Sequence, residues 1–298
     1  MNLYPTILCA IDFSRHSRRA LRLALALAAR QHSRVVAVHA IEPLLAEAAA
    51  TLTASSTLEP DAERELIALV ENERRAVAGA PAVDATVRVG PPASVILEAA
   101  ENAGAGLIAM GTQGLGGLRK LFFGSIAERV LRDAPIPVVA VPVPDDDNGS
   151  DAPAIREVMA AVELDDTAEA IAGHAATVAD ALDVPLVLLH VVSRVYGAPR
   201  AASVEDAAER LRESNARERL GGLAERVGRT GVGPVVEIRS GPAAEEIASA
   251  AAARQALVTL ASGGNDEHHR PGSIAYRVLC LSDLPVLAVP VRRRSSGD

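Results

Sequence analysis

The sequence predicts an α/β protein made of two tandem domains, each an open five-stranded parallel sheet with helices on both faces. Short apolar runs alternate with segments of helical periodicity, which is the pattern of parallel strands joined by crossover helices. The pattern occurs twice, because His39 recurs as His190 and Gly90 as Gly241, both at an offset of 151 residues. A length of 298 residues is sufficient for two domains that each bury a core.

The first strand and the first helix are expected over residues 6–11 and 14–30. The run TILCAI is short and apolar and is followed by Asp12, as expected for a buried parallel strand that ends at a carboxylate. Over residues 14–30 the apolar side chains fall at helical spacing, and arginines occupy the other face. Ser14 is placed to cap this helix.

The second strand is expected over residues 34–41, RVVAVHAI. Residues 43–58 are rich in Ala and Thr and are expected to be irregular, whereas residues 61–79 have helical periodicity and end near Gly79. The remaining strands of this copy are expected over residues 83–89, 106–110 and 137–143, and the remaining helices over residues 93–103 and 125–133.

The acidic, turn-rich stretch PDDDNGSDAP separates the two copies. We therefore expect domains over residues 1–144 and 154–292, joined by a linker over residues 145–153. Later matches, such as Gly124 with Gly272, have an offset of 148, so the second copy has small deletions before this point.

Composition and charge restrict the partners of this chain. The net charge of −8 and the pI of about 5.5 disfavour nucleic acid and anionic membranes. The N-terminus lacks a basic, apolar leader and no apolar run is long enough to span a bilayer, so we expect a cytoplasmic protein. Cys9 and Cys280 lie in strand-like runs and are expected to be buried thiols in a reducing compartment.

The segment MGTQGLGGLRKLFFGS, residues 110–125, has the pattern of a phosphate-binding loop. Glycines at 111, 114 and 124 follow an apolar strand and precede a helix that begins at Ser125. Glycine permits positive φ and lets a ligand approach backbone N–H groups, and a helix N-terminus adds unpaired donors. Asp12, at the end of the first strand, is placed to accept hydrogen bonds from ribose hydroxyls.

Some of these residues also have purely structural interpretations. Ser125 and Glu128 match the capping box S-x-x-E, in which the serine hydroxyl serves the helix N-terminus, and the two roles can coexist. Asp12 alternatively only terminates a strand. His39 and His190 recur at the same place in both copies, which favours a structural, hydrogen-bonded histidine over a ligand.

Metal binding and catalysis have little support. His268 and His269 lack a third ligand at coordinating spacing, so a solvated loop is the favoured interpretation and no metal ligand is predicted. Arg119 and Lys120 either neutralise phosphate charge or have no role. The chain has no nucleophile with a paired base, no G-x-S-x-G elbow and no P-loop lysine, so we predict no catalytic residues and at most slow hydrolysis of a bound nucleotide.

The spacing G-x2-G-x9-G-S after an apolar strand resembles the ATP-binding motif of the universal stress proteins. Further matches are the strand that ends at Asp12 with Ser14 after it, VHA at 38–40, the Gly-Pro turn at 90–91 and SIAERVLRDAPIPVVAVP at 125–142. The resemblance covers nearly the whole chain as two fused copies. It implies two tandem flavodoxin-like domains of the adenine nucleotide alpha-hydrolase-like type.

By this resemblance the first copy binds ATP, with or without Mg²⁺. The residues of this sequence that match the family's nucleotide contacts are Asp12, Ala40, Gly111, Gly114, Gly124 and Ser125. Phe13 stands where the family usually has glycine, which places a ring beside the site.

The second copy departs further from the family pattern. Ala261 replaces the first motif glycine, Glu163 replaces Asp12, and the span from Gly264 to Gly272 is shorter and carries two acidic residues. Carboxylates near phosphates repel them, so we expect an empty or altered second site.

The function that the resemblance implies is a nucleotide-dependent regulator of the stress response with an unidentified protein partner. Domains of the family pair through their edge strands, here 137–142 and 285–290, which predicts an intramolecular pseudo-dimer and allows a homodimer of tandem chains. One rival is an interaction or scaffold protein with vestigial pockets, in which Phe13 fills the first. The other is a weak ATPase, which the lack of a base disfavours.

Overall fold

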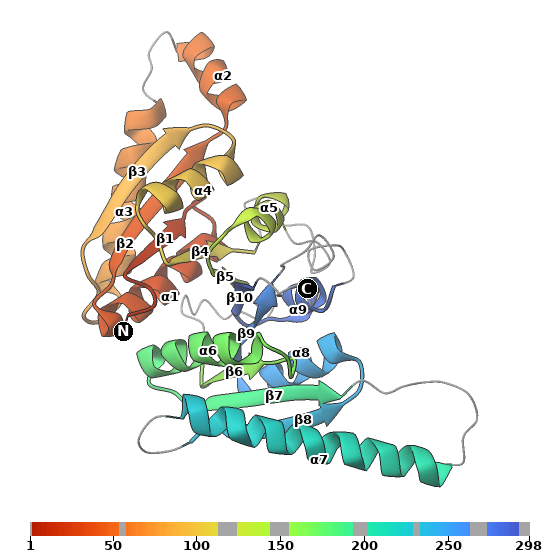
Figure 1. Cartoon of the computed structure of the whole chain (residues 1–298). Coiled ribbons are helices and arrows are strands. Elements are labelled where there is room, and N and C mark those ends of the chain that lie inside the picture. Colours follow the sequence, from red (N-terminus) through yellow and green to blue (C-terminus); the bar gives the residue numbers. More distant parts are fainter. Residues whose placement is uncertain are drawn as a thin grey trace, which may run out of the picture. The chain divides into compact units, whose positions relative to one another are not determined.

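The computed structural model describes residues 2–53, 58–112, 124–143, 155–192, 202–228, 233–262 and 273–291. The chain divides into two compact units, Met1–Pro153 and Ala154–Asp298 (Figure 1).

The N-terminal unit contains a parallel sheet with the strand order β3-β2-β1-β4-β5. The strands are β1 (Thr6–Ala10), β2 (Arg34–Ile41), β3 (Val83–Val89), β4 (Leu107–Gly111) and β5 (Val138–Val141). The helices are α1 (Arg15–Gln31), α2 (Pro43–Thr53), α3 (Leu58–Arg75), α4 (Pro92–Asn102) and α5 (Ser125–Asp133).

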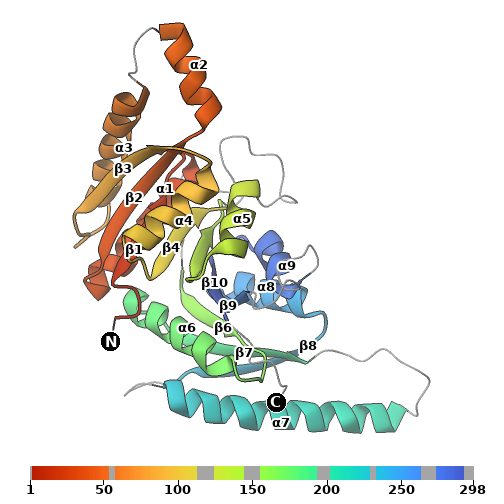
Figure 2. The same cartoon turned by 45° about the horizontal axis from the view of Figure 1, so that its top comes forward.

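Helices cover both faces of this sheet. α1 packs beside α3 on one face, and α4 packs beside α5 on the other (Figures 1 and 2). The chain progresses from β1 outward to β2 and β3 and then returns to the other side of β1 with β4. Adjacent loops therefore diverge above β1 and β4, which is where ligands bind in open parallel sheets.

The C-terminal unit repeats this topology with the strand order β8-β7-β6-β9-β10. Its strands are β6 (Glu157–Ala161), β7 (Leu186–Val192), β8 (Val235–Ser240), β9 (Ala256–Ser262) and β10 (Val286–Pro290). Its helices are α6 (Ala168–Leu182), α7 (Ala202–Val227), α8 (Ala243–Arg254) and α9 (Ile274–Leu281). The predicted fold class is confirmed: both units are flavodoxin-like, with five parallel strands between layers of helices.

The cores lie between the sheets and their helices. The central strands β1 and β4 are almost completely buried, because helices cover both of their faces. On α1, Leu21 and Leu25 are fully buried at a spacing of four residues. An ion pair between Arg22 of α1 and the buried Glu73 of α3 joins the two helices on that face.

Three local predictions were wrong. The segment expected to be irregular after the second strand contains α2, because alanine and leucine favour helix and outweigh its threonines. The following helix, α3, begins at Leu58 and ends at Arg75, before Gly79, which has a φ of 73° in the turn that follows. Cys280 lies in α9 and not in a strand; a short apolar run does not distinguish the two.

Candidate functional site at the carboxyl edge of the N-terminal sheet

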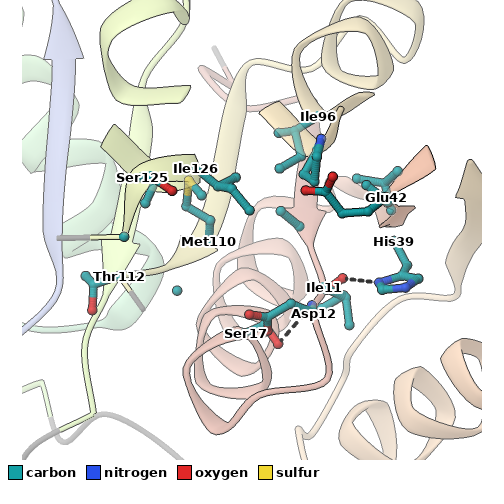
Figure 3. Close-up of a pocket in the computed structure, with 17 residues that line it drawn as sticks. Ile11, Asp12, Ser17, His39, Glu42, Ile96, Met110, Thr112, Ser125 and Ile126 are labelled. Atoms are coloured by element: carbon teal, nitrogen blue, oxygen red, sulfur yellow. Dashed lines mark hydrogen bonds between the residues drawn. The ribbon is translucent and has the colours of Figure 1, made fainter. Parts of the chain in front are cut away.

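A cavity of about 390 Å³ opens at the carboxyl ends of β1, β2 and β4, where the strand order reverses (Figure 3). The first turns of α4 and α5 complete its wall. Its lining residues are Ala10, Ile11, Asp12, Ser17, Val38, His39, Ala40, Glu42, Pro92, Ile96, Met110, Gly111, Thr112, Gly124, Ser125, Ile126 and Ala127.

Asp12 follows β1 and is tied to the start of α1. Its Oδ1 accepts hydrogen bonds from the backbone N–H of Ser14 at 3.0 Å and from the Ser14 hydroxyl. The Ser14 Oγ in turn accepts from the N–H of Ser17 at 3.2 Å, so the predicted cap is confirmed. The second carboxylate oxygen of Asp12 has no partner among the described residues, and Asp12 lines the cavity.

Phe13 packs against the side of the site and does not fill it. Its φ of 63° is a left-handed conformation that glycine adopts more easily, which accounts for the family's glycine at this place. The ring contacts the imidazole of His39, with 4.6 Å between ring centroids, and Phe13 is not among the lining residues. His39 is hydrogen-bonded as predicted, because its Nδ1 donates to the Ile11 carbonyl at 2.7 Å.

Gly111, the last residue of β4, is required by packing. A Cβ at this position would lie 2.5 Å from the Cβ of His16 and 3.0 Å from the backbone nitrogen of Ser17, both in the first turn of α1. Its φ is not positive, nor is that of Gly124, which is −60°. The expectation that these glycines provide positive φ was therefore wrong. Gly111 instead lets α1 approach β4.

The start of α5 faces the cavity without a side-chain cap. Gly124 occupies the N-cap position, and its N–H donates to the Thr112 carbonyl at 2.9 Å, which joins the two chain segments at this point. Ser125 is the first helical residue. The N–H of Glu128 donates to the Gly124 carbonyl, so the capping box predicted as an alternative for Ser125 and Glu128 does not form among the described residues.

The cavity combines apolar walls with two carboxylates. Ile96, Pro92 and Met110 provide apolar surface, and Glu42 at the end of β2 points its carboxylate into the cavity beside Ile96 (Figure 3). Asp12 is the other acid. The lining contains no lysine or arginine among the described residues, and no group of three potential metal ligands occurs in the part of the chain that the structure describes.

The comparison with known families decides what kind of protein has this fold and cavity. The universal stress protein family matches residues 3–142 and 154–290, which together make up most of the chain. This chain belongs to the universal stress protein family. The predicted tandem repeat is thereby confirmed.

Two relatives of this universal stress protein each match about one half of the chain. One from Thermus aquaticus is 40% identical over 142 residues, which cover 47% of this chain and 99% of that protein. One from Methanocaldococcus jannaschii is 32% identical over 148 residues, which cover 48% of this chain and 85% of that protein.

Solved structures extend the likeness to the whole chain. A universal stress protein from Archaeoglobus fulgidus has a TM-score of 0.62 at 19% identity and covers 96% of this chain and 98% of its own. A Pseudomonas aeruginosa protein of unknown function has a TM-score of 0.68 at 17% identity, with coverages of 96% and 92%. These likenesses show the fold alone.

Five of the six residues predicted for the nucleotide site lie together in the cavity: Asp12, Ala40, Gly111, Gly124 and Ser125. Gly114, like Arg119 and Lys120, lies outside the described residues. The nucleotide contacts of all six stay a prediction.

Glu42 and Ile96 are among the lining residues that the sequence analysis did not assign to the site. Glu42 is the residue after β2, and Asp12 lies two residues after β1. The position of Glu42 at the end of a strand could therefore have indicated that it belongs to the site. Ile96 lies inside α4 and has no such signal, because only the packing of α4 on the sheet brings it to the cavity.

The second half of this universal stress protein repeats the scaffold with a shifted acid. His190 Nδ1 donates to the Val162 carbonyl at 2.9 Å, which repeats the bond of His39 in the second half. Asp165 Oδ1, however, accepts from the N–H and hydroxyl of Thr167 at 3.0 and 2.6 Å. This pattern is that of Asp12 with Ser14, so Asp165 and not Glu163 is the structural counterpart.

The helix that corresponds to α5 also differs. Ser273, which aligns with Ser125, is the N-cap of α9, and its Oγ accepts from the Tyr276 N–H at 3.2 Å. The hydroxyl in the second half therefore serves the helix, whereas that of Ser125 lines the cavity. Ala261 lies within β9, and residues 263–272, which include the predicted acidic loop, lie outside the described part.

None of the helices in the described part of the chain is long and apolar enough to cross a membrane.

Proposed function

We propose that the N-terminal half binds ATP in the cavity between β1, β2, β4 and α5 and acts as a nucleotide-dependent regulator of the stress response. The observation that supports this most is the uncapped first turn of α5, which faces a cavity at the topological switch point. The first N–H groups of a helix have no partner within it and carry a partial positive charge. This is the environment in which phosphates bind.

The two ends of the cavity suit the two ends of a nucleotide. Phosphates fit at the start of α5, where the Ser125 hydroxyl adds a donor. The base fits at the opposite end, where Ile96 and Pro92 face the end of β2. Asp12 and Glu42 are acceptors only, so they suit the ribose hydroxyls and the exocyclic amine of adenine, and they repel phosphate.

Magnesium would arrive with the nucleotide. The described residues provide no cluster of three ligands, and Mg²⁺ commonly binds through substrate phosphates and one or two carboxylates. Asp12 is the lining carboxylate next to β1, and its second oxygen is placed to bind such an ion.

The test places a charge at the N-cap of α5. Gly124 has φ −60° and ψ 136°, which any residue adopts, and both Asp and Asn are good N-caps. Gly124→Asp and Gly124→Asn should therefore both fold. Because a carboxylate a few ångströms from phosphate costs about 1–4 kcal/mol, we expect the Asp variant to bind ATP about tenfold or more weakly than the Asn variant in calorimetric titrations. Equal affinities for the two variants would exclude phosphate binding at this helix.

A further inference from the structure

A second hollow, of about 610 Å³, lies in the C-terminal half at the carboxyl ends of β6 and β7, beside α7. Its lining residues are Leu164, His190, Val191, Val192, Arg212, Asn215, Ala216 and Arg219. In Figure 1 α7 is the long helix that runs along β7 and β8.

The two halves differ at the place where this hollow lies. In the N-terminal half, the ring of Phe13 packs against His39. In the C-terminal half, Leu164 and His190 both line the hollow, and the Arg219 guanidinium donates to the Leu164 carbonyl. The loop between β6 and α6 is also two residues longer than the loop between β1 and α1. β1 and β6 are 151 residues apart in the sequence, whereas the helix N-caps Ser14 and Thr167 are 153 residues apart.

Polar groups gather on one side of the hollow. Arg212, Asn215 and Arg219 are spaced three and four residues apart, so they lie on one face of α7. All three are exposed, and neither Arg212 nor Asn215 has a partner among the described residues. Arg219 uses one N–H for the Leu164 carbonyl, which fixes the guanidinium at the rim and leaves other donors available.

The acidic side chains of this region are not among the lining residues of the hollow. Glu213 accepts a hydrogen bond from Ser240 at 3.0 Å, and Asp165 accepts from Thr167. Glu218 lines the adjacent hollow on α7 together with Arg219 and Arg226, and not this one. Among the described residues, the lining of the hollow therefore has two arginines and no carboxylate.

The floor of the hollow is apolar. Val192 and Ala216 are 8% and 4% exposed, and Val191 beside them is half-buried. Guanidinium groups bind phosphate and carboxylate through paired N–H donors, and an apolar floor favours an apolar body on the same molecule. We infer that the hollow between α7 and the end of β7 binds a small organic anion, whose phosphate or carboxylate contacts Arg212 and Arg219 and whose apolar body lies over Val192 and Ala216.

The test uses the full chain and two probes, phenyl phosphate and inorganic phosphate, in calorimetric titrations. Phenyl phosphate should bind more tightly than inorganic phosphate because of the apolar floor. Arg212→Glu should weaken the binding of phenyl phosphate about tenfold or more, because it replaces a charge-assisted hydrogen-bond donor by a carboxylate that repels the phosphate. Arg217→Glu is the matched control, because Arg217 is exposed on the same helix and does not line the hollow.

Because Arg212 has no partner among the described residues, its replacement should leave the melting temperature unchanged, and a loss of binding then reports on the site. Equal affinities of the Arg212→Glu and Arg217→Glu variants would overturn the inference, as would a wild-type chain that does not bind phenyl phosphate at millimolar concentration. Benzoate in place of phenyl phosphate distinguishes carboxylate from phosphate ligands. The comparison of Arg212→Glu with Arg217→Glu is independent of nucleotide binding in the N-terminal half, because neither residue lines the N-terminal cavity.

Discussion

Replacing Gly111 by alanine should destabilise the N-terminal half before any ligand is added. The new Cβ would lie 2.5 Å from the His16 Cβ and 2.9 Å from the His16 carbonyl carbon, so β4 and the first turn of α1 must separate. Overpacking of this kind costs about 1–3 kcal/mol. For a unit of this size the melting temperature should fall by about 3–10 °C.

The assay is differential scanning calorimetry of the ligand-free chain, followed by ATP titration. Gly173→Ala is the control, because Gly173 lies within α6 and a Cβ added there would have no atom within 4 Å; it should stabilise its half by about 0.5–1 kcal/mol. Gly111→Ala should also weaken ATP binding, since the Ser17 hydroxyl that accepts from the Asp12 N–H would move. A Gly111→Ala variant that melts like the wild type but no longer binds ATP would refute the packing explanation.

Three further predictions concern single side chains. Ser273→Ala should cost about 0.5–2 kcal/mol of stability through the lost cap, whereas Ser125→Ala should leave the melting temperature unchanged and weaken ATP binding; the reverse pattern would contradict the assignment. Thr259→Val should stabilise the protein by about 1 kcal/mol in urea unfolding, because the Thr259 hydroxyl is fully buried without a partner among the described residues; a loss of stability would reveal a hidden partner. Burial favours a raised pKa for Glu237, but the hydrogen bonds and charges of Arg239 and Arg254 lower it overall. The ionised Glu237 therefore stabilises the fold above its ordinary pKa, and this stabilisation is lost as the pH falls below it. In Glu237→Gln the free energy of unfolding should change less between about pH 5 and pH 3 than in the wild type.

Much of the fold could be predicted because its strands are buried on both faces. Such strands have continuous apolar runs, and β2 was predicted with its observed bounds from RVVAVHAI. The helix over residues 125–133 was also predicted with its observed bounds. α2 was not, because an Ala- and Thr-rich segment without amphipathic spacing has no periodic signal, and its leucines Leu44 and Leu45 remain exposed.

The positions of several site residues could be predicted from the sequence, but the physical reasons for these residue types could not. Strand ends are visible in the sequence, so Asp12 and Gly111 were placed in the cavity that the structure shows. That Gly111 accommodates α1 depends on His16, which only the packing of α1 on β4 brings near. Likewise, an alignment by constant offset selects Glu163, whereas the hydrogen bonds to Thr167 identify Asp165.

The most direct test of the central claim is native mass spectrometry of the purified full chain with and without added Mg-ATP. We expect a single ATP bound per chain, lost in Gly124→Asp and retained in Gly124→Asn, if the first turn of α5 binds the phosphates as proposed. A chain that binds no nucleotide at millimolar Mg-ATP, or that binds it equally in the two variants, would contradict the account.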